Sequence, residues 1–378
     1  MSTTSPTDIR IPADLLPADG RFGCGPSKVR PDAVSGLAAT GRTYLGTSHR
    51  QPTVKSVVGR LRAGLAELFS LPDGYVVALG NGGATLFWDI ATVCLIERRS
   101  QHLVFGEFST KFRAAAAAAP FLDAPDVVQS PPGTHPDAVA VAGVDLYALT
   151  HNETSTGVMM PVGRPAGADA GALVAVDATS GAGGLSFDPS EADAYYFSPQ
   201  KCFGADGGLW VALLSPAALD RQRRLAASGR WVPASLDLGL AVDNSDLDQT
   251  YNTPALATLW LFADQVGWML EKGGLEWCAA RSSRSAETLY QWASSSEYAS
   301  PFVAKPDDRS TVVGTVDLDP SVKDASVCAA LRANGIVDTE AYRKLGRNQL
   351  RVGMFPNVDP DDVEALTHCI DYVVERLA

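Results

Sequence analysis

The chain has 378 residues, of which 46% are hydrophobic and 20% are charged, as in ordinary globular proteins. This length exceeds the size at which one hydrophobic core stops growing, so we expect two structural domains. The formal net charge of -12 argues against broad binding to nucleic acids or anionic membranes, because these polyanions would repel the protein. Any anionic ligand must therefore meet a local cluster of basic residues.

The sequence favours a cytoplasmic protein without a metal site. Residues 1–20 lack a basic start followed by an apolar run of about 7–15 residues, so they do not resemble a secretory signal. The most apolar stretch, residues 75–96, is interrupted by GNGG at 80–83 and by Asp89, so no membrane span is expected. The six cysteines lie far apart without histidines at metal-ligand spacing, which indicates reduced thiols.

The first predicted elements are an N-terminal arm over residues 1–20 and an amphipathic helix from Thr53. In this helix valines and leucines recur at three- and four-residue steps from Val54 to Leu68. Short β-rich runs follow, several of them continuously apolar, as strands covered on both faces are. They occupy 75–79, 102–106, 145–150, 173–177, 194–198 and 208–214. Their alternation with helical segments predicts a mostly parallel sheet in an α/β domain over 21–267.

The pattern changes after the sequence NTP at 252–254. Two long helical segments are expected over 254–270 and 275–294, and shorter elements follow them. These are a strand at 311–317, a helix at 322–333, a strand at 349–355 and a helix at 361–377. The order predicts a small α+β C-terminal domain over residues 268–378.

The segment GNGGAT at 80–85 follows the first predicted strand. Ligands of open α/β sheets bind beyond the carboxyl ends of the strands. A helix that starts near Ala84 would offer free N–H groups and the positive end of its dipole to a phosphate. A plain tight turn is the alternative. The segment does not match G-x-x-x-x-G-K-S/T, so a nucleotide P-loop is not indicated.

An acidic and a basic residue follow two other predicted strands. Asp177 ends the strand LVAVD, where a buried carboxylate needs a cationic partner. Lys201 comes three residues after the strand AYYFS and before a glycine-rich stretch, where lost hydration would lower its pKa and favour a neutral, nucleophilic amine. A site for pyridoxal phosphate (PLP) needs such a lysine to bind the cofactor as a Schiff base and an acid to keep the pyridine nitrogen protonated. Lys201 and Asp177 match both requirements.

Other interpretations of these residues remain open. A lone lysine after a strand can be a solvated surface residue, and an aspartate before small residues can belong to a turn. Ser198 to Lys201 also match S-x-x-K, which occurs in serine β-lactamases and penicillin-binding proteins. That motif is accompanied by S-D-N and K-T-G, and neither of these occurs here.

Four residues are candidate ligands for an anionic substrate. His49 and Arg50 lie in a loop before the first amphipathic helix, and Arg347 and Arg351 flank a C-terminal strand. The planar guanidinium group binds carboxylates and phosphates with two hydrogen bonds. Such a residue taken singly is more often a surface charge than a ligand.

Taken together, the motifs resemble those of the phosphoserine aminotransferases, which are homodimeric fold type I PLP enzymes of the class V aminotransferase group. The resemblance covers nearly the whole chain, and its specificity comes from the joint occurrence of the motifs in this order. They are FGCGPSKVR (22–30), TSHR (47–50), GNGGAT (80–85), HNETSTG (151–157), VDATSG (176–181), FSPQKCFG (197–204), YNTP (251–254) and LRVGMFPN (350–357).

The resemblance implies roles for individual residues toward the cofactor. Lys201 would form the Schiff base, Asp177 would pair with the pyridine nitrogen and Thr154 would hydrogen-bond the ring hydroxyl. The cofactor phosphate would be bound by Ala84, Thr85 and Gln200, together with Asn252 and Thr253 of the neighbouring subunit in a homodimer. Phe108 stands where many members have a tryptophan over the ring, and it keeps the stacking role with a smaller face.

The resemblance also implies the reaction, which is reversible amino transfer from glutamate to 3-phosphohydroxypyruvate in L-serine biosynthesis. The related 4-phosphohydroxythreonine, on the route to pyridoxine, is a further candidate substrate. Arg50 and Arg351 would bind the substrate carboxylate or phosphate, with His49 beside them. Many members have an arginine directly after GGA and a His-Arg pair before the C-terminal arginine, whereas this chain has Thr85 and Gly346-Arg347. The expected phosphate ligands are therefore the least determined part of the site.

Two rival functions are retained. One is another class V enzyme, such as an alanine-glyoxylate aminotransferase or a cysteine desulfurase, although no cysteine has the setting of a catalytic loop residue. The other is a non-catalytic protein that keeps the fold and binds PLP. The presence of Lys201, Asp177 and the arginines argues against the second.

Overall fold

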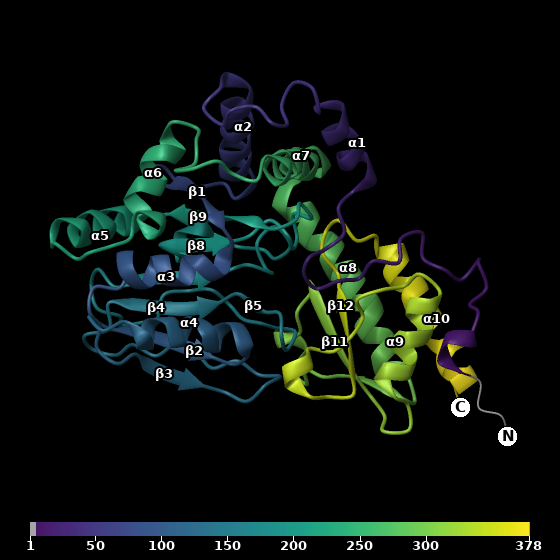
Figure 1. The fold of residues 1–378 in the computed structure, drawn as a ribbon. Coiled ribbons are helices and arrows are strands. Elements are labelled where there is room, and N and C mark those ends of the chain that lie inside the picture. The colour runs from purple at the N-terminus through teal and green to yellow at the C-terminus, as the bar shows by residue number, and fades with distance from the viewer. Residues whose placement is uncertain (1–4, 378) are drawn as a thin grey trace.

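The structure is a computed structural model that describes residues 5–377, so the first four residues of the predicted N-terminal arm lie outside the described part. Its larger half is built on a seven-stranded sheet with the order β1-β9-β8-β7-β4-β2-β3 (Figure 1). The strands are β1 (Val76–Gly82), β2 (Ser100–Val104), β3 (Asp126–Gln129), β4 (Leu146–Thr150), β7 (Leu173–Asp177), β8 (Ala194–Phe197) and β9 (Gly208–Leu214).

The sheet is mostly parallel, as the sequence predicts. Neighbouring strands from β3 to β8 run parallel, and only β9 runs antiparallel to both of its neighbours, β8 and β1. Parallel strands end at the same edge of the sheet, so the residues after β4, β7 and β8 come together there. A two-stranded ribbon of β5 (Asn152–Glu153) and β6 (Val158–Met159) follows β4 at this edge.

The first strand is longer than predicted. It runs to Gly82 instead of ending at residue 79, because GNG continues the ladder with β9 and Gly82 pairs with Gly208. Gly80 pairs with Trp210, and a Cβ atom at Gly80 would lie 2.2 Å from the indole ring, so the bulky partner needs a glycine there. Only Gly83 is left as the turn before α3 (Ala84–Cys94).

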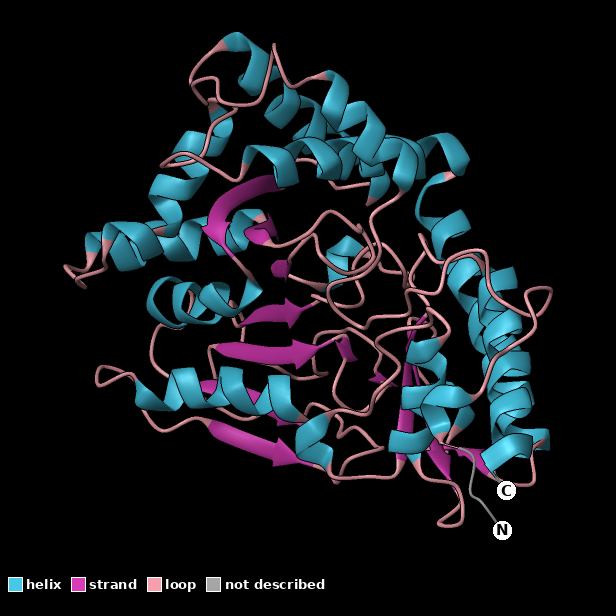
Figure 2. Ribbon diagram, turned by 45° about the vertical axis from the view of Figure 1, so that its right-hand side comes forward, coloured by secondary structure: helices cyan, strands magenta, loops and turns pink. Residues whose placement is uncertain are grey.

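Helices cover both faces of the sheet (Figure 2). One face packs on α3, α4 (Glu107–Ala118), α5 (Pro216–Ala227) and α6 (Leu238–Asp246), and the other on α2 (Pro52–Leu68) and α7 (Leu256–Lys272). Successive strand residues alternate between the two cores, as in β7, where Val174 and Val176 face the α2 side while Leu173 and Ala175 face the α3 side. This double burial explains the continuously apolar runs in the sequence.

The C-terminal part has a core of its own. An antiparallel sheet of β10 (Ala299–Pro301), β11 (Val313–Leu318) and β12 (Gln349–Gly353) packs with α8 (Gly274–Ser295), α9 (Asp324–Ala333) and α10 (Pro360–Leu377), on the right of Figure 1. Ile9 and Ile11 of the N-terminal arm are buried in the same core, and α1 (Pro31–Ala39) contacts α7. The exact domain boundary at residue 268 stays a prediction. No helix among residues 5–377 is long and apolar enough to cross a membrane.

Candidate active site

A cavity of about 310 Å³ lies at the carboxyl edge of the large sheet, within the size range of small-molecule sites, roughly 300–1,000 Å³. Its walls come from the start of α3, the start of α4, the ends of β4, β7 and β8, and a loop near the N-terminus. Seven of the residues predicted for the site line it: Ala84, Thr85, Phe108, Thr154, Asp177, Gln200 and Lys201.

Lys201 has the environment of a nucleophilic amine. Its side chain is only 8% exposed, and burial lowers the pKa of Lys201 to about 8, with smaller effects from nearby charged groups. About one amine in ten is then neutral at pH 7, against about one in three thousand at the ordinary lysine pKa. The ammonium group donates a hydrogen bond to the backbone oxygen of Cys24. The backbone approaches closely because Gly25 has no side chain, since a Cβ atom there would lie 2.3 Å from Lys201 Nζ.

Asp177 is buried at the wall of the cavity, and both of its carboxylate oxygens accept hydrogen bonds. Burial raises the pKa of Asp177, whereas hydrogen bonds from Thr179 and Trp88 and the charge of Lys201 oppose this rise. The backbone N–H and the hydroxyl of Thr179 donate to Oδ1 at 3.0 and 2.6 Å, and the indole Nε1 of Trp88 donates to Oδ2 at 2.9 Å. The structure therefore keeps this carboxylate in one orientation.

The loop after β4 contributes Thr154 and aligns the start of α4. Thr154 Oγ1 lies 2.8 Å from Ser180 Oγ. The neighbouring Glu153 is fully buried and accepts hydrogen bonds from the backbone N–H groups of Phe108 and Ser109 at 3.1 and 3.0 Å. A carboxylate at a helix N-terminus interacts favourably with the helix dipole. Glu153 thereby fixes Phe108, whose ring centroid lies 6.0 Å from Lys201 Nζ.

The start of α3 forms the other end of the cavity. Gly83 is its N-cap residue, and the N–H of Ala84 donates to the buried hydroxyl of Ser198 at 2.9 Å. Ser198 in turn donates to the backbone oxygen of Leu209 at 2.6 Å, so the helix start is attached to the sheet. The N–H of Ala84 is thus satisfied within the protein, whereas the N–H of Thr85 has no hydrogen-bond partner among residues 5–377. The N–H of Thr85 and the helix dipole support the predicted phosphate end.

These residues fit PLP. The cavity combines a buried amine, a buried carboxylate, a hydroxyl and a helix start, which match the aldehyde, ring nitrogen, ring hydroxyl and phosphate of the cofactor. The side-chain oxygen of Gln200 is buried without a hydrogen-bond partner among the described residues. Because the two ends of an amide group can exchange places, Gln200 can turn its NH₂ group toward an anion. A polar group left unsatisfied at a cavity wall indicates a missing ligand.

A second cavity of about 420 Å³ adjoins the first, and Gly25 and Pro26 line both. Arg351, on β12, lines the second cavity and donates a hydrogen bond to the backbone oxygen of Thr154 at 3.2 Å. Its guanidinium carbon lies 5.3 Å from the ring centroid of Tyr342, and its Nε is buried without a partner among residues 5–377. Arg351 is thus oriented but still has a free donor.

The structure does not bring Arg347 to either cavity. Its guanidinium group forms a two-pronged ion pair with Asp317, with 3.0 Å between Nε and Oδ1, and lies over the ring of Phe302. Asp317 also accepts a hydrogen bond from Gln349 at 2.9 Å across the β11–β12 ladder. Arg347 is therefore already satisfied by a carboxylate of its own chain.

The remaining four predicted residues gather at another place in the chain. His49 Nδ1 lies 3.2 Å from Thr253 Oγ1, and Arg50 donates a hydrogen bond to the side chain of Gln249. Asn252 lies next to Thr253, and its backbone oxygen accepts a hydrogen bond from Asn81 at 3.1 Å. None of the four lines the cofactor cavity of the same chain. Burial and the charge of Arg50 both lower the pKa of His49.

Sequence reasoning missed several residues of the two cavities. Trp88 could have been found, because it lies one helical turn after Ala84 and shares its face of α3. Tyr342, Arg343 and Lys344 carried no recognisable signal, since they lie in a loop whose path depends on the C-terminal domain.

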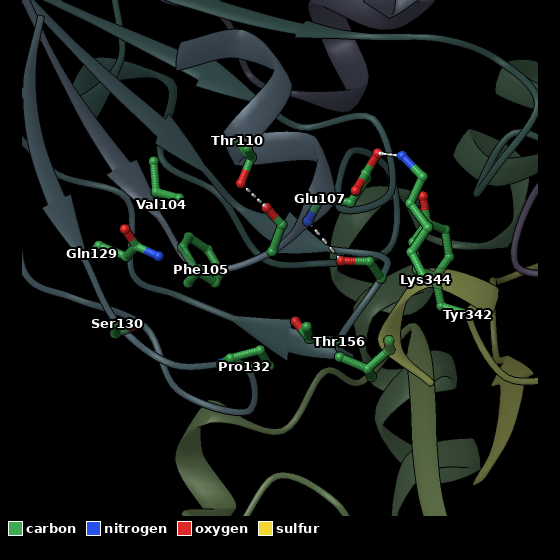
Figure 3. A pocket seen from close by; sticks show the side chains of 13 residues that line it. Val104, Phe105, Glu107, Thr110, Gln129, Ser130, Pro132, Thr156, Tyr342 and Lys344 are labelled. Atoms are coloured by element: carbon green, nitrogen blue, oxygen red, sulfur yellow. Dashed lines mark hydrogen bonds and ion pairs between the residues drawn. The ribbon is translucent and has the colours of Figure 1, made fainter. Parts of the chain in front are cut away.

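Lys344 links the two domains beside the site. It forms an ion pair with Glu107 at the start of α4 (Figure 3), and it lines both the second cavity and a third one of about 210 Å³. The pair is exposed on the lysine side, so salt will screen it.

Comparison with known proteins places the chain in a family. Residues 137–366, more than half of the chain, match the family model of class V aminotransferases. The phosphoserine aminotransferase of Nocardioides sp. is 63% identical over 370 residues, which cover 98% of this chain and 99% of the relative.

Solved structures show the same fold. A phosphoserine aminotransferase from Cytophaga hutchinsonii superposes with a TM-score of 0.85 at 24% identity and covers 93% of this chain and 99% of its own. A PLP-bound phosphoserine aminotransferase from Trichomonas vaginalis superposes with a TM-score of 0.78 at 19% identity, with 93% and 99% coverage. These likenesses confirm the predicted fold type I architecture.

The family match also confirms the expected enzyme class, a PLP-dependent aminotransferase. By its similarity along nearly its whole length, the chain belongs to the phosphoserine aminotransferase family of the class V aminotransferases.

Proposed function

We propose that the chain transfers the amino group of glutamate to 3-phosphohydroxypyruvate, giving 2-oxoglutarate and 3-phosphoserine, with PLP as cofactor and in L-serine biosynthesis. The observation that carries this proposal is the buried amine of Lys201 in one cavity with Asp177, beside a second cavity bordered by arginines. The identity of 63% to a phosphoserine aminotransferase supports the substrate pair.

The residues of the first cavity would hold the cofactor and move one proton. PLP supplies an electron sink that stabilises negative charge on the substrate carbon that loses its proton. Lys201 would hold the cofactor covalently, and once released its neutral Nζ would take the proton from the substrate α-carbon and return it at a different atom. Asp177 would pair with the ring nitrogen, Thr154 with the ring hydroxyl, and Phe108 would cover one face of the ring.

The second cavity would bind the anionic ends of the substrates. Arg351 has a buried free donor, and Arg343 has no ion-pair partner among residues 5–377. Asp338 and Glu340 also line this cavity, and Arg332 forms ion pairs with both of them. We infer that Arg351 binds a carboxylate or phosphate and that Arg343, rather than the neutralised Arg347, is the second anion ligand from this part of the chain.

The site is complete only in a homodimer, we propose. His49, Arg50, Asn252 and Thr253 lie together but outside the cofactor cavity of their own chain, as expected if they serve the site of a partner subunit. A subunit mixing experiment tests this point. Lys201→Ala and Arg50→Ala dimers, each inactive alone, should regain about a quarter of wild-type activity after subunit exchange, because half the dimers then hold one intact site. Absence of any gain in exchanged dimers would contradict the shared site.

The test of the activity uses purified enzyme with PLP. Glutamate-dependent conversion of 3-phosphohydroxypyruvate should be observed, and Lys201→Ala should lose both turnover and the adduct that borohydride traps on the lysine. No turnover by protein that contains PLP would overturn the proposal and favour a non-catalytic role. Faster turnover of glyoxylate with alanine would favour the alanine-glyoxylate alternative, and assay of the phosphohydroxythreonine pair tests the role in pyridoxine synthesis.

The cellular location that we propose is the cytoplasm. All six cysteines are free and buried, which fits a reducing compartment. Addition of a fluorescent C-terminal tag and cell fractionation would check this location.

A further inference from the structure

Trp88 makes a contact that the described mechanism does not use. It lies on α3, is 5% exposed, and belongs to the core between α3 and the sheet. Its ring borders the cofactor cavity, yet its indole Nε1 points to Asp177 Oδ2 at 2.9 Å. An indole can only donate, so this bond requires an acceptor lone pair on the carboxylate.

The bond from Trp88 completes the support of the Asp177 carboxylate. Thr179, two residues further along the chain, supplies both donors of Oδ1, whereas Trp88 supplies the donor of Oδ2 from a different element. Donors on a carboxylate favour its ionised form, and here they act against burial, which raises the pKa of Asp177. Without the indole N–H, one oxygen of a fully buried charge would lose its protein donor.

The position of Trp88 also couples the two ends of the cofactor cavity. Ala84, at the start of α3, belongs to the proposed phosphate end, and Trp88 follows it by one helical turn. The helix start is attached to Ser198 through the N–H of Ala84. One rigid helix therefore sets both the phosphate end and the orientation of the carboxylate at the ring end.

We propose that Trp88 is a positioning residue, whose indole N–H holds the Asp177 carboxylate so that the proton shared with the cofactor ring stays on the ring nitrogen. The inference rests on the proposed function, because it requires Asp177 to be the partner of that nitrogen. The other titratable groups that act on Asp177 or feel its charge are Lys201, Tyr195 and Tyr196.

The experiment follows the ring nitrogen directly. Holoenzyme is loaded with PLP that carries ¹⁵N in the ring, and the ¹⁵N chemical shift is recorded from pH 6 to 9 for wild type, Asp177→Asn, Trp88→Phe and Phe87→Leu. Phe87 is the matched control, because it is buried on the same helix and stacks on Tyr196 at 4.4 Å but donates nothing to Asp177. Thermal denaturation and the PLP content of each variant are measured in parallel.

The inference predicts a protonated ring nitrogen in wild type and Phe87→Leu, and an unprotonated one in Asp177→Asn. In Trp88→Phe the carboxylate becomes a stronger base, so the equilibrium of the shared proton should move from the ring nitrogen toward Asp177 by roughly ten- to a hundredfold, the usual effect of one hydrogen bond to a charged group. The ¹⁵N chemical shift should therefore move toward that of Asp177→Asn over the whole pH range. If the ¹⁵N chemical shift of the ring nitrogen in Trp88→Phe equals that of wild type, the inference is overturned and the proposed function stays intact. An unprotonated nitrogen in wild type overturns the assigned role of Asp177 itself.

A second measurement needs no substitution at Trp88. Protein with ¹⁵N-labelled indoles should show one of its seven tryptophan N–H signals shifted upfield in Asp177→Asn, because an amide oxygen accepts a weaker bond than a carboxylate. Seven unchanged indole signals contradict the bond and the inference, even where Trp88→Phe does not fold.

Discussion

Gly25→Ala should impair catalysis far more than folding. A Cβ atom at position 25 would lie 2.3 Å from Lys201 Nζ and 2.4 Å from Cε, whereas carbon contacts are comfortable at about 3.5–4.0 Å. The lysine must therefore move its amine by about 1 Å or more. Because the end of a lysine is flexible, this movement costs little stability, but a misplacement of that size can cost about 10²-fold in rate.

Position 25 also has a φ of +135°, which disfavours alanine by itself. Gly143→Ala is the matched control, since Gly143 has a φ of +80° and nothing within 4 Å of the added Cβ. Both variants should lose about 1–2 kcal/mol of unfolding free energy in urea titrations. Only Gly25→Ala should lose about 10²-fold in kcat/KM for glutamate. Equal activities of the two variants would refute the reasoning.

Three further predictions concern Lys201, the arginines and Phe108. Between pH 8 and 10.5 the free energy of unfolding of the cofactor-free protein should rise by up to about 3 kcal/mol. The reason is that Lys201, with a pKa of about 8 in the folded state, binds fewer protons there than in the unfolded state. Urea unfolding of Lys201→Met should lack this rise. Steady-state assays should show a loss of about 10²-fold or more in kcat/KM for Arg351→Ala but less than about threefold for Arg347→Ala, whose guanidinium already pairs with Asp317. Similar losses would contradict the distinction. Phe108→Leu should weaken PLP binding by about tenfold, measured by fluorescence titration, because aromatic stacking is worth about 0.5–1.5 kcal/mol, and unchanged affinity would exclude stacking by Phe108.

Local sequence patterns predicted the elements that are strongly apolar or strongly periodic. The helix from Thr53 and the five-residue strand that ends at Asp177 lie as expected. Burial of one helical face requires apolar residues at three- and four-residue steps, and burial of both faces of a strand requires a continuous apolar run. The edge strand β3 was not predicted from the sequence, because its residues alternate between half-buried and exposed and its ends are polar. The extension of β1 to Gly82 was not predicted either, because glycines usually end a strand. The glycine at position 80 is explained only by its partner Trp210 in the neighbouring strand.

The cofactor end of the site could be predicted from the sequence, whereas the substrate end could not. Lys201, Asp177 and the residues of the helix start follow strands of one parallel sheet, so chain order alone indicates that they meet. Arg343 and Arg347 lie four residues apart in one C-terminal segment, and only the tertiary structure shows that Asp317 pairs with Arg347. The bond between Trp88 and Asp177 joins residues 89 positions apart. Sequence by itself therefore determined the fold class and the cofactor chemistry, because both depend on local patterns. Tertiary structure decided which arginines are free to bind an anion and that Trp88 holds the Asp177 carboxylate, because these contacts join residues distant in the chain.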